Sequence, residues 1–110
     1  MIYQKSASGS ELLPDDATGD WPAGTWAKLT IPHHSGPFTL YLREFTETDE
    51  ADLKHLNPKD RKELNKYLVR RLFIGGDKQA IERPELLTKA ARGFALLYKE
   101  MVRVQNGERP

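Results

Sequence analysis

The feature that most constrains the fold is a long series of apolar residues at helical spacing near the C-terminal end of the sequence. Between Pro84 and about Gln105, apolar side chains recur every three or four residues, the period of an α-helix with one buried face. Such a helix has to cover another apolar surface, and it could also bury part of a second copy of the chain. Its apolar residues are Leu86, Leu87, Ala90, Ala91, Phe94, Leu97, Tyr98, Met101, Val102 and Val104.

Two shorter stretches, residues 26–31 and 38–45, alternate apolar and polar residues and predict strands. The segment between them holds Pro32, Gly36 and Pro37, which cannot continue a strand and favour a turn. We therefore expect an antiparallel hairpin. A hairpin alone is marginally stable in water, so its apolar face needs the helices.

Two further helices are expected between the hairpin and the long helix. The first is short, begins near Thr48 with Thr46 or Thr48 as its cap, and ends near Leu56. The second begins at Asn57-Pro58 and ends at Gly75-Gly76. Its apolar stripe consists of Leu64, Tyr67, Leu68 and Leu72.

These elements predict a single α+β domain over residues 1–110, with a small antiparallel hairpin or sheet packed against two or three C-terminal helices. Residues 1–24 are rich in turn formers and are expected to be irregular, although Ile2 and Tyr3 could add a short edge strand. Residues 25–45 form the hairpin, and residues 46–106 are helical.

Composition narrows the class of protein. The chain has 110 residues and no cysteine, which excludes disulfides, thiolate metal sites and a cysteine nucleophile. Its first residues form no apolar run of signal-peptide length, and no stretch approaches the roughly 20 apolar residues that span a membrane. We expect a soluble, cytoplasmic protein.

The charges divide unevenly along the chain. Residues 1–53 hold three cations and nine anions, a net charge of −6, whereas residues 54–110 hold fourteen cations and seven anions, a net charge of +7. This asymmetry is typical of a surface for nucleic acid or for an acidic partner. Attraction between the two halves, within one molecule or between copies, is the alternative reading.

The basic residues of the second predicted helix form the first candidate binding surface. Lys59, Lys62, Lys66 and Arg70 are spaced by three and four residues and so share one helix face, which could follow a phosphate backbone. The long helix adds cations at helical spacing, and Glu63, Glu85 and Glu100 interrupt the pattern. A solvated helix surface would have the same composition, so both readings stay open.

Trp21 and Trp26 form the second candidate, because tryptophan is enriched among the residues that dominate binding energy at interfaces. The alternative is that both rings close one end of the core. The free edge of the strand at residues 38–45 could also add a strand from a partner.

No residue pattern predicts catalysis, a metal or a cofactor. His33 and His34 are adjacent, and neighbours on an extended chain point in opposite directions, so they rarely bind one ion together. Asp15, Asp16 and Asp20 lack the spacing of a calcium loop, and the sequence contains no nucleophile elbow, dinucleotide fingerprint or phosphate-binding loop. We expect a protein that is not an enzyme.

The stretch Thr39-Leu40-Tyr41-Leu42-Arg43-Glu44-Phe45-Thr46-Glu47-Thr48-Asp49 faintly resembles the passage from a strand into an acidic helix that opens small phage tail-assembly chaperones. The resemblance covers eleven of the 110 residues. It implies a small accessory protein that binds other proteins, of phage or mobile-element origin. Our prediction is therefore a non-enzymatic adaptor, inhibitor or assembly factor that acts through protein–protein contacts, with nucleic-acid binding through the basic helix face as the alternative.

Overall fold

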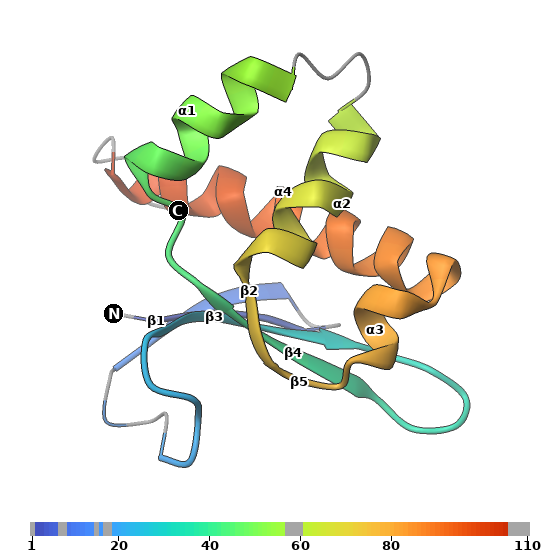
Figure 1. The fold of residues 1–110 in the computed structure, drawn as a ribbon. Coiled ribbons are helices and arrows are strands. Elements are labelled where there is room, and N and C mark those ends of the chain that lie inside the picture. The colour runs from blue at the N-terminus through green and yellow to red at the C-terminus, as the bar shows by residue number, and fades with distance from the viewer. Residues whose placement is uncertain (1, 7–8, 15, 17–18, 57–60, 106–110) are drawn as a thin grey trace.

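The computed structural model describes residues 2–6, 9–14, 16, 19–56 and 61–105, and it confirms the α+β class. Helices gather on one side of a five-stranded sheet (Figure 1). The elements in chain order are β1 (Ile2–Ser6), β2 (Gly9–Leu13), β3 (Thr25–Ile31), β4 (Phe38–Arg43), α1 (Glu47–Leu56), α2 (Arg61–Leu72), β5 (Phe73–Gly76), α3 (Gln79–Glu82) and α4 (Pro84–Gln105).

The sheet has the strand order β2-β1-β3-β4-β5. The hairpin of β3 and β4 is antiparallel as expected, and it pairs Lys28 with Tyr41 and Leu29 with Leu40. However, β1 runs parallel to β3, so the sheet is mixed and larger than the small antiparallel sheet that the sequence predicts. The parallel pairing arises because the chain crosses from β2 to the far side of β1 before β3 begins.

The expectation that residues 1–24 are irregular was wrong for the two segments that form β1 and β2. These strands form a hairpin, and β1 is an interior strand rather than an edge strand. Tyr3 explains the stability of β1, since its side chain is only 8% exposed and belongs to the core. A single buried ring gives no clear alternation, so the sequence allowed only a short edge strand here and did not indicate an interior one.

A second correction concerns Gly75 and Gly76, which end α2 in the sequence-based prediction. Helix α2 ends at Leu72, and both glycines belong to β5, which pairs antiparallel with β4. Gly76 has a φ of +107°, and a Cβ there would lie 2.3 Å from the carbonyl oxygen of Thr39. Glycine is therefore required where β5 passes close to β4.

The core lies between the sheet and α4, as the apolar pattern of the sequence predicts. Leu29, Leu40 and Leu42 of the sheet are buried, and so are Phe94 and Leu97 of α4. Helix α2 adds Val69 and Leu72 to the same cluster. The predicted start of α2 at Asn57-Pro58 lies outside the described residues.

The other face of the sheet is crossed by the segment between β2 and β3, which lies on the opposite side from α1, α2 and α4 (Figure 1). The Trp21 ring packs on Tyr41 with their centroids 5.5 Å apart. Pro22 reaches as far as β5, where its Cγ would be 2.9 Å from a Cβ added at Gly75. This segment therefore spans several strands of the outer face.

Among the helices that the structure describes, none combines the length and the apolar character that a membrane crossing requires.

Candidate binding site

The cations of α2 lie in two different environments. Lys66 and Arg70 line a hollow of about 230 Å³ between α2 and the start of α4, together with Glu63, Tyr67, Pro84 and Leu87. Lys66 Nζ lies 3.4 Å from the Glu63 carboxylate, while Arg70 is exposed. Lys59 lies outside the described residues, and for Lys62 only the helical backbone is described.

Arg71 of the same helix is half-buried and is bonded to α1. It donates hydrogen bonds to Asp49 and Asp52 of α1, and its Nη1 also donates to the Tyr67 hydroxyl at 3.0 Å. The hydrogen bond to Asp49 is the main cause that raises the pKa of Arg71 above its ordinary value. Arg71 therefore joins α2 to α1 and does not extend the basic face.

Asp49 is the centre of this network, and its side chain is 1% exposed. Its carboxylate accepts hydrogen bonds from Arg43, Arg71 and the backbone and hydroxyl of Thr46. The bonds from Arg43 are the largest cause of a pKa for Asp49 well below its usual range. Thr46 precedes α1 and Asp49 is its third residue, so the pair forms a reciprocal cap on the helix.

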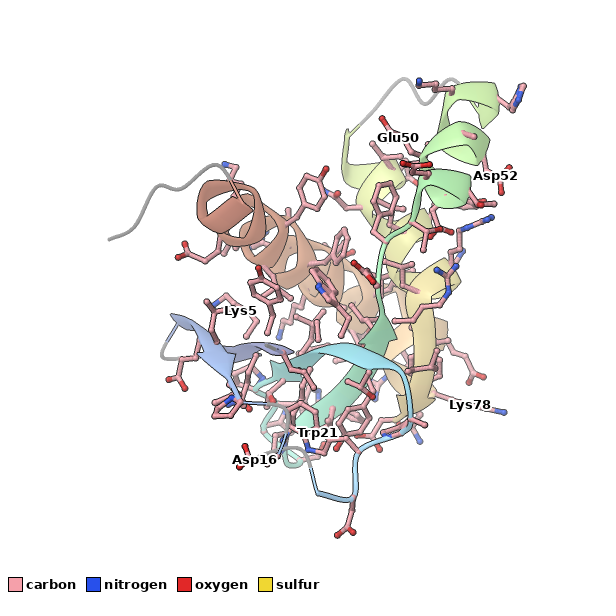
Figure 2. All side chains as sticks on the ribbon, turned by 90° about the vertical axis from the view of Figure 1, so that its left-hand side faces the viewer. Lys5, Asp16, Trp21, Glu50, Asp52 and Lys78 are labelled. Carbon is pink, nitrogen blue, oxygen red and sulfur yellow. The ribbon has the colours of Figure 1, made fainter. Side chains whose placement is uncertain are left out.

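The structure does not bring Trp21 and Trp26 together on one surface. Trp26 packs against the core on the helix side, with its centroid 5.1 Å from that of Tyr3. Trp21 lies on the outer face of the sheet (Figure 2), and Lys28 Nζ sits 5.3 Å from the centroid of its ring. Each tryptophan thus contributes to a different face.

Another hollow, larger than the one beside Lys66 and Arg70, is one that the sequence did not predict. It measures about 570 Å³ and is enclosed by α1, α2 and α4. The Phe45 and Tyr98 rings meet edge to face within it, with centroids 6.2 Å apart, and Tyr98 remains 37% exposed. The lining residues are Phe45, Leu53, Leu64, Asn65, Leu68, Phe94, Ala95, Tyr98 and Lys99.

We call this the apolar hollow. Its aromatic and leucine side chains form an apolar surface that is open to solvent. Lys99 is the charged residue in its lining. The sequence did contain apolar residues that indicate this surface. Phe45 comes two residues after the end of β4, and Tyr98 is one of the apolar residues that widen the buried face of α4. What could not be foreseen is that α1 and α2 leave part of this face uncovered.

The histidine loop does not form a metal centre in the described part of the chain, where no three potential ligands gather. The His33 and His34 rings lie side by side with centroids 4.0 Å apart, rather than pointing in opposite directions, because a turn closes between His33 and Gly36. His33 Nδ1 shares a hydrogen bond of 2.7 Å with the Ser35 hydroxyl.

No protein-family model matches the chain, no curated protein resembles it closely enough to match, and no solved structure matches its fold. The resemblance to phage tail-assembly chaperones stays a prediction from the sequence.

Proposed function

We propose that this chain is a non-enzymatic binding protein that docks an acidic, amphipathic segment of another protein. The segment's apolar side chains would enter the apolar hollow, and a carboxylate would face Lys99 in its lining. The observation that favours this proposal is an open hollow between three helices that combines exposed Tyr98 with Leu53 and Leu64.

The chemistry of the hollow suits a protein segment. Apolar grooves between helices bind amphipathic helices through side chains spaced three and four residues apart, and tyrosine is frequent among residues that dominate such contacts. A ring that is already positioned by Phe45 loses little conformational freedom on binding.

The charge of α2 and α4 favours an acidic partner. Residues 61–105, which include both helices, hold eleven cations and five anions, whereas the third wall, α1, is acidic in its first turn. Lys99 lines the apolar hollow, whereas Lys66 and Arg70 line the separate hollow between α2 and the start of α4. Complementary charge speeds encounter and excludes basic partners more than it adds affinity.

The decisive experiment places a photo-crosslinking amino acid at Tyr98 and, as a matched control, at Thr88, which is exposed on the same helix outside the hollow. Both variants are irradiated in a lysate of the source cells after nuclease treatment. The crosslinked peptide is then identified by mass spectrometry.

The proposal expects a protein segment with apolar residues flanked by Asp or Glu, crosslinked at position 98 and not at 88. It also expects the purified partner to bind the Lys99→Glu variant more weakly. Crosslinks to nucleic acid in an untreated lysate, to a second copy of the chain or to a basic segment would overturn it. Recovery of nucleic acid would instead support the basic face of Lys62, Lys66 and Arg70.

A further inference from the structure

A third pocket lies on the other flank of α4 from the apolar hollow, between this helix and the sheet. It measures about 370 Å³. Strand β1 contributes Lys5, and the end of β3 contributes Thr30, Ile31 and the following Pro32. Helix α4 contributes Lys89, Arg92, Gly93 and Leu96. We call this the basic pocket.

Three of its eight lining residues are cations and none is acidic. They come from two elements far apart in the sequence, β1 and α4, so the fold rather than a local charge run brings them together. In the part of the chain that the structure describes, no carboxylate forms an ion pair with Lys89 or Arg92. These two charges therefore remain available to a ligand.

Gly93 is the one lining residue of the basic pocket that has no side chain. Glycine is unfavourable in the interior of a helix, and Gly93 stands near the middle of α4. A Cβ at this position would lie 3.8 Å from Cγ of Lys5 and 3.9 Å from Cδ2 of Leu29, which is ordinary contact. The packing therefore leaves room for a Cβ at this position, and glycine keeps this part of the lining beside Lys5 (labelled in Figure 2) free of a side chain.

The remaining walls are apolar or weakly polar. Ile31, Pro32 and the 48%-exposed Leu96 offer contact for a carbon skeleton. The volume falls within the range of small-molecule sites, roughly 300–1,000 Å³. Arginine pairs with phosphate through two parallel N–H donors, and lysine adds point charges.

The positive charge of the basic pocket also acts on His33, in the loop that follows Pro32. Desolvation is the first cause that lowers the pKa of His33, and the charges of His34, Arg83 and Lys89 lower it further, against an opposing contribution from Glu85.

We propose that the basic pocket binds the phosphate group of a small phosphomonoester, with Arg92, Lys89 and Lys5 around the phosphate and Ile31, Pro32 and Leu96 against its organic part. This site lies on a different flank of α4 from the apolar hollow and does not depend on the docking proposed above.

The test is a titration followed by amide chemical shifts in two-dimensional NMR. The probes are glycerol 3-phosphate and adenosine monophosphate, with glycerol, adenosine and sulfate as their controls. The variants are Arg92→Gln and Lys89→Gln, and Lys99→Gln removes a cation of the same helix outside the pocket. A well-dispersed spectrum of each variant establishes that it is folded.

The proposal expects saturable shifts at Lys5, Ile31 and Gly93 with both phosphate esters. Each pocket variant should weaken binding by about tenfold, and Lys99→Gln should leave it unchanged. The proposal is overturned by an absence of shifts, by equal shifts with sulfate or the dephosphorylated controls, or by shifts centred on Lys66 and Arg70. It is also overturned if an oligonucleotide binds with an affinity that grows with its length while both esters fail to bind.

Discussion

The guanidinium of Arg43 donates one hydrogen bond to each carboxylate oxygen of Asp49, both at 2.8 Å. This pair fastens the end of β4 to the first turn of α1, and Arg71 extends it to α2. Because Asp49 is 1% exposed, its charge depends on these partners instead of water.

The first prediction is that Asp49→Asn lowers the free energy of unfolding by about 3 kcal/mol, since it leaves two guanidinium groups without their shared anion. Urea denaturation at neutral pH measures this loss. Asp52→Asn is the matched control, because Asp52 also binds Arg71 but is 45% exposed. That control should cost less than about 1 kcal/mol. Equal losses for the two variants would contradict the central role of Asp49.

The second prediction concerns pH. The pKa of Asp49 is lower in the folded chain than its ordinary value of 3.8, so the folded state favours the carboxylate. The stability that Asp49 contributes is therefore present above the unfolded pKa and is lost as the pH falls toward the folded pKa. The difference in unfolding free energy between the native chain and Asp49→Asn should be constant from about pH 5 to pH 8 and shrink below about pH 4. A difference that grows in acid would refute this assignment.

The third prediction is that Gly76→Ala destabilises the fold by about 3 kcal/mol or more. The new Cβ would collide with the backbone of Thr39, and the positive φ at position 76 would be strained for alanine. Gly36→Ala is a suitable comparison, since Gly36 has a similar φ of +117° and open space around it. That change should cost only about 1 kcal/mol, the backbone strain alone. Thermal unfolding of the two variants separates collision from strain, and similar melting temperatures would argue against the close approach of β5 to Thr39.

The fourth prediction separates the two tryptophans. Trp26→Ala should cost about 3 kcal/mol, because its ring packs against the core. Trp21→Ala should cost about 1 kcal/mol, through lost contact with Tyr41 and Lys28. Under the proposed function, Trp21→Ala should also bind the partner as the native chain does. Loss of partner binding on this change would restore Trp21 as an anchor.

The fifth prediction is that Tyr98→Ala weakens partner binding by at least tenfold, about 1.4 kcal/mol, and lowers folding stability by about 1 kcal/mol. Leu96→Ala removes another exposed apolar side chain of α4, outside the apolar hollow. Calorimetry with the partner should show little effect of that control. If both changes weakened binding equally, the hollow would not be the contact.

The long helix and the central hairpin were predictable from the sequence because each has a sustained period. Apolar residues at helical spacing from Leu86 to Val104 define α4, and alternation through Ile31 and Leu42 defines β3 and β4. For β1 the sequence allowed a short edge strand at Ile2 and Tyr3, but its interior place in the sheet could not be predicted, since that place depends on the burial of Tyr3 in the core. For β5, the paired glycines indicated a stop, whereas tertiary contact with Thr39 makes them part of a strand.

The candidate site was less predictable for the same reason. Helical spacing places Lys66 and Arg70 on one face, as found, but it cannot show that Glu63 pairs with Lys66. Helical spacing also could not show that Arg71 forms an ion pair with Asp49, a residue 22 positions away. The apolar hollow and the basic pocket both arise where elements distant in sequence leave a gap, and no local pattern records such gaps.

Helix α4 covers the sheet, yet it follows all five strands along the chain. While the protein emerges from the ribosome, the buried leucines of β3 and β4 therefore remain without their helical cover until α4 has been synthesised. Nascent chains that stop before Pro84 would expose this apolar face of the sheet, and they would be candidates for chaperone capture or proteolysis.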